Sequence, residues 1–351
     1  MKALIAMSGG VDSSVAAYLT QQRGYDCIGV TMKLHGAALG GEGSCGTAED
    51  AKDAVKVAKA LGMPHYLIDY SADFALEVME RFVRAYEDGQ TPNPCIDCNR
   101  YMKFGRLHRV AEEMDCDKVV TGHYARICFE NGRWLLKKGK DPRKDQSYVL
   151  YFLSQNQLAH TLLPLGELTG KEEVRALASV QGMLTADKPD SQDICFVPDG
   201  DYATFIRNHT GKDYPPGDFV DPDGKVLGRH KGLIHYTIGQ RRGLGLALLQ
   251  PGYVTEKKMK ENQVVVSPRE GLLCDSIQAK DLNWIAFDKA PAEFTCMVRT
   301  RYQAPEVPAT VTTLENGEVL VQFETPQKRP AAGQSVVFYD GDTVLGGGVI
   351  I

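Results

Sequence analysis

The sequence lacks several features that would assign it to whole classes of protein. It has no apolar run of the roughly 18 residues needed for a membrane span. No signal-peptide pattern precedes its first apolar run, so we expect a cytoplasmic protein with no membrane partner. A net charge of −5 excludes a uniformly basic nucleic-acid coat, although it is compatible with a local basic face. Repeats and low-complexity segments are also missing.

Cysteine is present, but not in the pattern of a structural framework. An odd count of 9 in a long chain argues against a disulfide scaffold. Cys95 and Cys98 form a C-x-x-C pair, but no second pair exists to complete a zinc ribbon. Most of the cysteines are therefore expected to be small buried residues. They are Cys27, Cys45, Cys95, Cys98, Cys116, Cys128, Cys195, Cys274 and Cys296.

Residues 1–125 alternate between β-leaning runs and segments with helical periodicity. This rhythm predicts an α/β fold, with a parallel sheet covered by helices on both faces and a ligand at the carboxyl ends of its strands. Thr47 is expected to cap one helix and Gly62 to end it. The expected strands are 2–7, 26–34, 65–70 and 117–125, and the expected helices are 47–62, 72–89 and 103–114.

The pattern then becomes irregular. A hairpin is expected over 126–139 with Asn131-Gly132 at its turn, followed by a helix opened by a capping-box spacing of Thr169 and Glu172. Another short helix follows Asp199. From about residue 210, short β-rich runs predict a small linking domain and a C-terminal β-barrel. The expected domains are 1–205, 206–265 and 266–351.

The stretch "SGGVDSS" (8–14) follows the first strand and opens a helix. A helix N-terminus leaves backbone N–H groups unpaired and favours an anion. Two glycines allow a phosphate to approach closely, three serines add hydroxyl donors, and Asp12 is expected either to orient the loop or to help hold Mg²⁺. The lysine of a Walker loop is absent and the spacing differs. A simple capped turn would need fewer of these features.

Two cysteines lie in polar contexts. "GQTPNPCIDCNRYMKFG" (89–105) predicts a proline-stiffened loop leading into a helix, with Cys98 at or next to its start. A helix N-terminus and the nearby Arg100 and Lys103 are expected to lower the pKa of that thiol. "SQDICFVPDGDY" (191–202) puts Cys195 between a polar loop and a helix. Either cysteine can instead be structural. Four basic runs (137–144, 228–232, 239–243 and 299–302) are candidate RNA contacts or solvated loops.

"SGGVDSS" resembles the PP-loop of ATP pyrophosphatases, which binds the departing pyrophosphate. With "TGHYAR" (121–126), "KDQSYVLYFL" (144–153), "GQRRGLG", "VRTRYQ" and the two cysteine stretches, the sequence resembles the MnmA family of tRNA-specific 2-thiouridylases over nearly its whole length. The resemblance implies that ATP adenylates the wobble uridine of lysine, glutamate and glutamine tRNAs. A persulfide on Cys195, loaded by a cysteine desulfurase or sulfur-relay protein, then delivers sulfur. Cys98 acts as the second thiol.

The resemblance also implies binding residues. ATP, with Mg²⁺, would contact Ala6, Met7, Ser8, Gly9, Gly10, Val11, Asp12, Ser13, Met32 and Gly122. The target base would meet Asn93, Pro94 and Cys95. His123 would face the tRNA, although a histidine at a strand end can equally be structural. The tRNA would further contact Lys144, Asp145, Gln146, Arg301, Tyr302 and Gln334. No resident metal ion is expected among these residues.

One departure from the family pattern leaves the mechanism open. Many members carry aspartate where this chain has Cys95, and Asp97 need not point the same way. Cys95, Cys98 and Cys195 together have the ligand types for three irons of a [4Fe–4S] cluster, which is a rival mechanism. Two other functions stay open: an amide-forming PP-loop synthetase, which would need an ammonia source, and a non-catalytic nucleotide-binding module, which would leave both polar-loop cysteines without a purpose.

Overall fold

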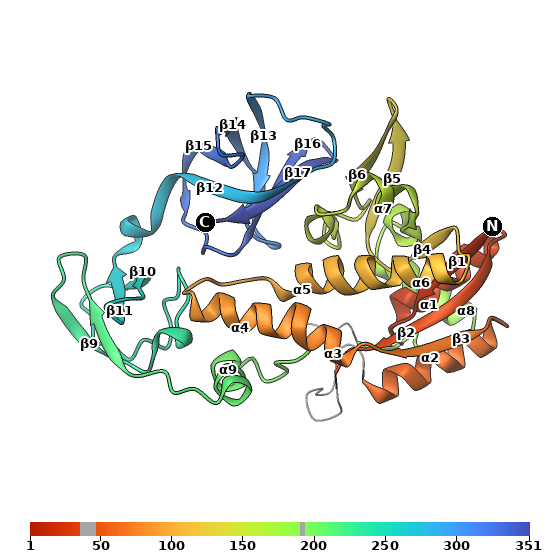
Figure 1. The fold of residues 1–351 in the computed structure, drawn as a ribbon, viewed down its shortest axis with the longest axis horizontal. Helices are drawn as coiled ribbons and strands as arrows, with labels where there is room; N and C mark the ends of the chain where they lie inside the picture. Colours follow the sequence, from red (N-terminus) through yellow and green to blue (C-terminus); the bar gives the residue numbers. More distant parts are fainter. Residues whose placement is uncertain (36–46, 190–193) are drawn as a thin grey trace.

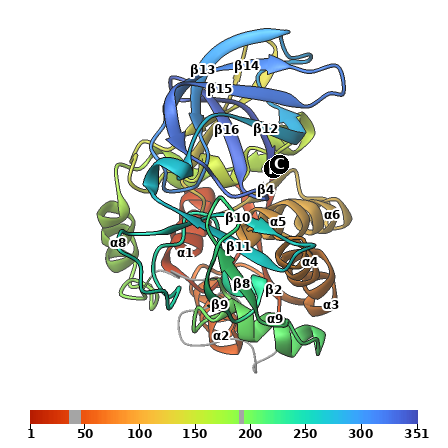
Figure 2. The same cartoon turned by 90° about the vertical axis from the view of Figure 1, so that its left-hand side faces the viewer.

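The computed structural model describes residues 1–35, 47–189 and 194–351. Cys45 and residues 191–193 of the Cys195 stretch lie outside these ranges. A helix-flanked parallel sheet lies at one end of the molecule, a small second sheet lies at the other, and a β-barrel lies above the long helices between them (Figures 1 and 2). This arrangement confirms the expected α/β fold with a C-terminal barrel. Within the described ranges no helix is long and apolar enough to span a membrane.

The N-terminal sheet has five parallel strands in the order β3-β2-β1-β4-β7. Because the order reverses beside β1, the carboxyl ends of β1 and β4 border the crevice where such sheets bind ligands. All four expected strands are present, but the one expected at 117–125 spans only residues 118–120, and β7 is a short addition that the sequence pattern did not indicate. The strands are β1 (Lys2–Ala6), β2 (Asp26–Lys33), β3 (His65–Asp69), β4 (Lys118–Val120) and β7 (Thr161–Leu162).

Helices cover both faces of this sheet. Ala3 and Ile5 of β1 pack with α1, α2 and α8, whereas Leu4 faces α6, as the two-residue period of a strand requires. Thr47 caps α2 as expected. The predicted Thr169–Glu172 spacing is wrong, because Thr169 donates to the Glu173 carboxylate from both its N–H (2.8 Å) and its hydroxyl (3.0 Å). These helices are α1 (Val11–Gln22), α2 (Ala48–Ala60), α6 (Leu107–Glu113) and α8 (Lys171–Val180).

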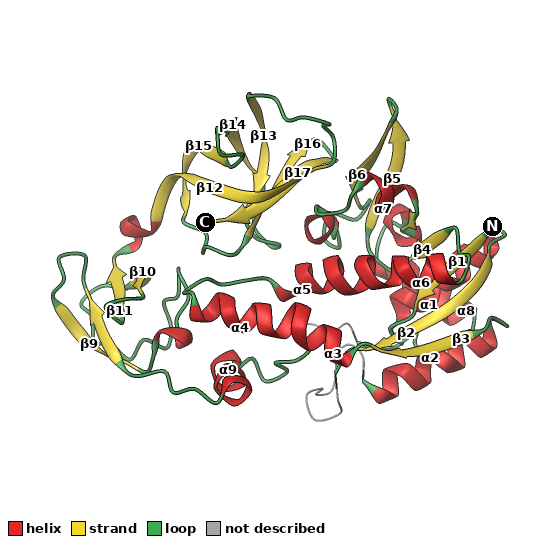
Figure 3. Cartoon of the chain, in the orientation of Figure 1, coloured by secondary structure: helices red, strands yellow, loops and turns green. Residues whose placement is uncertain are grey.

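Two long helices cross the middle of the molecule (Figure 3). Each contains a π-helical stretch, a feature that is frequent at functional sites. The first runs through α3 (Ser71–Phe74), η1 (Ala75–Met79) and α4 (Glu80–Glu87), and the second through α5 (Pro94–Asp97), η2 (Cys98–Arg106) and α6. The short helix α9 (Tyr202–Thr210) packs against the same apolar cluster as α4.

The central domain is a four-stranded sheet in the order β10-β11-β8-β9. The domain boundaries expected at 205/206 and 265/266 fall inside α9 and β11, so we propose to draw them in the adjoining loops instead. The strands are β8 (Gly217–Val220), β9 (Val226–His230), β10 (Tyr253–Lys258) and β11 (Gln263–Ser267).

Six C-terminal strands close a barrel because β12 pairs with both β15 and β17. The expected hairpin β5 (Ala125–Glu130) and β6 (Arg133–Lys138) has its Asn131-Gly132 turn, and it extends this sheet where Lys137 pairs with Thr343. The barrel strands are β12 (Leu273–Trp284), β13 (Glu293–Arg299), β14 (Val307–Thr313), β15 (Val319–Lys328), β16 (Ser335–Asp340) and β17 (Thr343–Ile350). The remaining elements are α7 (Gln155–Ala159), η3 (Ser147–Leu150), η4 (Pro164–Glu167), η5 (Leu233–His235) and η6 (Arg269–Leu272).

Candidate active site

The loop between β1 and α1 has the geometry of an anion site. Ser13 Oγ accepts from the Ser8 N–H at 3.2 Å and donates to the Gly10 carbonyl at 3.0 Å, and Ser14 Oγ donates to the same carbonyl at 2.9 Å. Within the described part of the chain, the backbone N–H groups of Gly10, Val11 and Asp12 have no acceptor. The serines therefore shape the loop, and the free donors of the helix N-terminus are left for a ligand.

Two glycines allow the loop to sit where it does. Gly9 has φ +75°, and a Cβ there would lie 2.2 Å from the Asp50 carbonyl oxygen. A Cβ on Gly122, just after β4, would lie 2.9 Å from the Asp12 carbonyl carbon and 3.0 Å from the Ser13 nitrogen. Both positions therefore require glycine for close packing of backbone on backbone.

The other residues expected to contact ATP lie around this loop. Ala6 ends β1, and Met7 is held by hydrogen bonds from its N–H to the Val30 carbonyl (2.8 Å) and from Thr31 Oγ1 to its own carbonyl (2.7 Å). Met32 is half-buried near the end of the neighbouring β2. The structure thus brings the run from Ala6 to Ser13 and Gly122 together, with Met32 on the adjacent strand.

Asp12 is held by two residues from outside the loop. Lys171 Nζ donates to both of its carboxylate oxygens, at 2.8 and 2.7 Å, and the Tyr124 hydroxyl donates at 2.5 Å. Lys171 is buried, with 8% of its surface exposed. Of the two roles expected for Asp12, this geometry supports orienting the loop.

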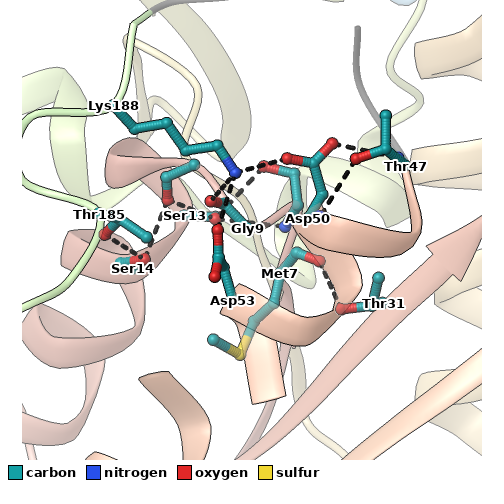
Figure 4. A network of polar contacts seen from close by, with 12 residues as sticks. Met7, Gly9, Ser13, Ser14, Thr31, Thr47, Asp50, Asp53, Thr185 and Lys188 are labelled. Atoms are coloured by element: carbon teal, nitrogen blue, oxygen red, sulfur yellow. Dashed lines mark hydrogen bonds and ion pairs between the residues drawn. The ribbon is translucent and has the colours of Figure 1, made fainter. Parts of the chain in front are cut away.

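A second lysine, Lys188, contacts the loop at Gly9 (Figure 4). Lys188 Nζ lies 3.1 Å from the Gly9 carbonyl oxygen, 2.6 Å from Asp50 Oδ1 and 3.1 Å from Asp53 Oδ2. Partial burial lowers the pKa of Lys188, but the hydrogen bonds with the two aspartates outweigh it and raise that pKa above its ordinary value. Lys188 is therefore a charged partner of the loop at neutral pH.

The helix that carries the C-x-x-C pair begins one turn before Cys98. Asn93 is the N-cap, its side chain accepts from the Cys95 N–H at 3.1 Å, and Pro94 is the first helical residue. Cys98 lies four residues further on, so the expectation that it stands at the helix start is corrected. The dipole effect fades beyond the first turn, so the position that benefits from it is that of Cys95, which is exposed.

Cys98 and Cys195 pack against the same apolar cluster, which we call the aromatic cluster (Phe74, Phe82, Tyr86, Phe196 and Phe205). Phe196, the residue after Cys195, anchors that cysteine to the cluster. Its ring centroid lies 5.8 Å from that of Phe74, 5.3 Å from Phe82 and 5.1 Å from Phe205. Both thiols are half-buried. Two cysteines that are distant in the sequence therefore pack against the same buried cluster.

Asp97 lies between the two cysteines of the pair in sequence. Burial raises its pKa to about 6, and the charge of Glu77 adds to this while Arg81 and Arg100 oppose it. It lines a cavity of about 580 Å³ between the long helices and the barrel. Asp97 is therefore a carboxyl group whose charge changes near neutral pH, one turn or less from Cys95 and Cys98.

Several residues expected to contact tRNA are used for internal contacts. His123 is buried, bonded through Nδ1 to Thr121 Oγ1 at 2.7 Å, with its ring 5.8 Å from Phe104. Burial, with a contribution from Lys103, holds its pKa well below the ordinary value. His123 therefore does not face solvent in this structure, as expected of a structural histidine at a strand end.

The segment 144–146 is also turned inward. Asp145 is buried and accepts from the Gly139 N–H, the Ser147 N–H and hydroxyl, and Arg299 Nη1 at 3.3 Å. Gln146 accepts from the Tyr124 N–H at 2.9 Å, while Lys144 is half-buried. Asp145 thus ties this segment to the barrel, so its carboxylate is not presented to an RNA.

The barrel residues divide into an exposed and an internal group. Arg301 is exposed. Gln334 instead donates to the Thr91 carbonyl at 2.6 Å, so it docks the barrel onto the loop before α5. Tyr302 is half-buried 6.0 Å from the Tyr148 ring, and burial raises its pKa, with added contributions from the charges of Asp145 and Cys95. The barrel therefore reaches the neighbourhood of Cys95.

The described residues do not support a preformed metal centre. Within 1–35, 47–189 and 194–351, no three His, Cys, Asp or Glu side chains gather as metal ligands would. Cys95, Cys98 and Cys195 are all described, so their present arrangement does not fit the ligand set of an iron–sulfur cluster.

Sequence reasoning missed the lysines at the loop. Lys171 and Lys188 lie about 160 and 180 residues from their partners Asp12 and Gly9 in the sequence. No spacing rule connects them, because their positions depend on how α8 and the segment after it pack on α1. A local sequence pattern can show that the loop has no lysine of its own. It cannot show which lysine from another segment contacts the loop.

Family profiles match consecutive parts of the chain. The profile described as a tRNA methyl transferase HUP domain matches residues 1–199, the PRC-barrel domain of the same name matches 203–268, and an aminomethyltransferase beta-barrel domain matches 274–350. Fold and loop together thus define a PP-loop nucleotide-binding protein of the HUP class.

Curated relatives narrow this class. The chain is 46% identical to tRNA-specific 2-thiouridylase MnmA of Lachnoclostridium phytofermentans, 45% to that of Clostridium acetobutylicum and 44% to that of Clostridioides difficile, with at least 99% of this chain and 98% of each relative covered. The chain belongs to the MnmA family of tRNA-specific 2-thiouridylases. A solved 4-thiouridine synthetase–RNA complex with bound ATP aligns with a TM-score of 0.37 at 16% identity, covering 60% of this chain and 50% of that one, which is too distant to carry an argument.

Proposed function

We propose that the protein is an ATP-dependent tRNA 2-thiouridylase that adenylates the wobble uridine and replaces its carbon-2 oxygen with sulfur. The observation that carries the proposal is full-length similarity to the 2-thiouridylases in a chain that combines a PP-loop with two cysteines on one apolar cluster. The profile names mention methyl transfer, but a loop suited to a departing pyrophosphate supports adenylation instead.

In the first step, the uridine O2 attacks the α-phosphorus of ATP and pyrophosphate leaves. The free N–H groups of Gly10, Val11 and Asp12 would stabilise the charge that develops on the departing group. Mg²⁺ is expected to arrive with ATP, because it is usually held by phosphates and one or two carboxylates. Asp12 is the carboxylate at the loop, although in this structure it is bound by Lys171.

In the second step, a persulfide on Cys195 supplies sulfur. Its terminal sulfur attacks C2 and AMP leaves, giving a mixed disulfide, which Cys98 attacks at the Cys195 sulfur to release 2-thiouridine. In the other order, Cys98 attacks first and frees hydrosulfide, which then displaces AMP. Both routes end with a Cys98–Cys195 disulfide, so an external thiol reductant is needed for turnover. A cysteine desulfurase or relay protein would load the persulfide.

The substrates proposed are tRNAs of the lysine, glutamate and glutamine type. Arg301, an exposed cation of the barrel domain, is the residue proposed to meet the phosphate backbone. An Arg301→Glu variant is expected to weaken tRNA binding and lower its salt dependence while leaving ATP binding unchanged. Lys289→Glu, another exposed charge reversal in the barrel, is the control.

A single-turnover assay tests the function. Iron-free protein with Cys195 preloaded as persulfide is mixed with ATP, Mg²⁺ and unmodified lysine tRNA, and 2-thiouridine is measured by mass spectrometry. Stoichiometric product supports the persulfide mechanism. Product only after anaerobic iron–sulfur reconstitution with sulfide would overturn that mechanism and make Cys95 a cluster ligand. No product under either condition would contradict thiolation itself.

A further inference from the structure

The PP-loop segment (8–14) contains no lysine, but Lys188 from a distant part of the chain contacts it. We propose that Lys188 is a positioning residue for pyrophosphate binding: by holding the Gly9 carbonyl, it fixes the direction of the Gly10 N–H that receives the anion. The proposal concerns ATP binding by the loop and is independent of how sulfur is delivered.

The ammonium group of Lys188 is fully used by the protein. A lysine has three N–H donors, and three acceptors surround Nζ: the Gly9 carbonyl and the carboxylates of Asp50 and Asp53, all at 2.6–3.1 Å. A lysine in a Walker loop touches the phosphates directly. Lys188 has no donor left for a phosphate in this arrangement, so its effect on the anion passes through the loop backbone.

The peptide between Gly9 and Gly10 transmits this effect. It is trans and planar, so its C=O and N–H point in opposite directions. Holding the carbonyl on the side of Lys188 therefore turns the Gly10 N–H to the other side. That N–H has no acceptor in the described part of the chain, and Gly10 is the N-cap of α1. A positive charge on the carbonyl also polarises the peptide and strengthens this donor.

The surroundings of Lys188 are rigid enough to position a peptide. Asp50 is fixed by a reciprocal capping box with Thr47 at the start of α2. On the other side, Arg175 of α8 donates to the carbonyls of Ala186 (2.6 Å) and Lys188 (2.9 Å). Residues of α2 thus hold the Lys188 ammonium group, and Arg175 of α8 holds the Lys188 backbone. The peptide that Lys188 contacts joins two glycines, so neither of its residues has a side chain that could fix its orientation.

Lys56 provides a matched control. Its ammonium group pairs with Asp53 at 3.1 Å, on the same carboxylate that Lys188 uses. Its side chain is 57% exposed, and among the described residues its ion pair is with Asp53 and not with the loop. Removing Lys56 changes the charge beside Asp53 by the same amount as removing Lys188. Only the Lys188 substitution removes the contact to the Gly9 carbonyl.

The test compares ATP and AMP binding to the full-length protein by calorimetry in the presence of Mg²⁺. AMP lacks the pyrophosphate group, so a residue that positions the pyrophosphate-binding N–H should affect ATP alone. Lys188→Met is expected to weaken ATP binding about tenfold or more and AMP binding less than twofold. Lys56→Met should leave both within twofold, and Lys188→Arg, which keeps the charge and its donors, should recover most of the ATP affinity.

Three results would overturn the proposal. Equal losses for ATP and AMP in Lys188→Met would indicate general damage to the nucleotide pocket. Equal ATP losses in Lys188→Met and Lys56→Met would indicate a charge effect at Asp53 rather than a held peptide. Unchanged ATP binding in Lys188→Met, even with thiolation lost, would move the role of Lys188 to another step. Because no tRNA is used, failure here is distinct from failure of the thiolation assay.

Discussion

At the PP-loop each nearby aspartate meets a cation: Asp12 is bound by Lys171, and Asp50 and Asp53 are bound by Lys188. Burial raises the pKa of Asp53, but its hydrogen bonds with Lys188 and Lys56 outweigh that and hold the pKa below its ordinary value. At the other end of the same domain, Asp97 lies beside Cys98 with two arginines near it, and burial still raises its pKa to about 6.

The difference corresponds to what each end must bind. A site for a polyanion has to keep its donors fixed before the ligand arrives, and paired charges fix them without leaving a net repulsive field. At the thiol end, Cys98 and Cys195 pack against the aromatic cluster. We infer that ion pairs preorganise the nucleotide end, whereas apolar packing positions the two cysteines at the thiol end.

The largest expected effect is that of Cys195→Ser, which should abolish sulfur transfer at the thiol end without affecting ATP binding at the nucleotide end. Cys195→Ser should reduce 2-thiouridine formation by about 10³-fold or more, as loss of a nucleophile does, while ATP binding stays within twofold of the parent. Mass spectrometry of the tRNA and calorimetry measure the two outcomes. Cys128→Ser, another half-buried cysteine on the β5–β6 hairpin, is the control. A weaker ATP complex in Cys195→Ser would break the separation.

Gly9→Ala tests the rigidity of the nucleotide end. Alanine at this position would have to adopt the left-handed backbone conformation that Gly9 has. Its Cβ would lie 2.2 Å from the Asp50 carbonyl oxygen. We expect a loss of about 2–4 kcal/mol of unfolding free energy, since backbone strain alone costs about 1–3 kcal/mol, together with loss of ATP binding. Gly24→Ala, at φ +81° with no neighbouring atom within 4 Å, isolates the strain. Equal losses in both variants would contradict the packing argument.

Lys171→Met tests the pairing of Asp12. Removal of this buried cation leaves the partly buried Asp12 carboxylate with the hydrogen bond from the Tyr124 hydroxyl but without its ion pair, which should cost about 1–3 kcal/mol of unfolding free energy. ATP affinity should fall as well, because an unpaired Asp12 repels phosphate. In Lys171→Met with Asp12→Asn the repulsion is removed, and ATP affinity should recover in part. No recovery would assign Lys171 a direct contact with ATP.

Asp97→Asn is the smallest expected effect and acts at the thiol end. Because the folded-state pKa of about 6 exceeds the ordinary 3.8, the protonated carboxyl favours folding below pH 4, and this contribution disappears as pH rises through 6. Asparagine carries no charge, so the variant should be more stable than the parent at pH 8, by on the order of 1–2 kcal/mol, and equal to it at pH 4. Denaturant unfolding at both pH values measures this, and a stability difference independent of pH would contradict it.

The sequence by itself determined those structural features that depend on residues close together along the chain. The two-residue and helical periods indicated the strands and helices around the loop, Gly9 and Gly10 marked the anion site, and Thr47 marked the cap of α2. These features could be predicted because a strand period, a left-handed glycine or an N-cap depends on residues a few positions apart. The start of the cysteine helix was expected near Cys98 and lies instead at Asn93-Pro94.

Tertiary structure alone decided which distant groups complete each site. It brought Lys171 and Lys188 to a loop without a lysine, placed Cys98 and Cys195 on one aromatic cluster, and turned His123, Asp145 and Gln334 inward although family resemblance assigned them to tRNA. The physical reason is that burial and ion pairing depend on how α8, the long helices and the barrel pack together. Local sequence patterns span a few residues, so they cannot show that residues about a hundred or more positions apart lie close together.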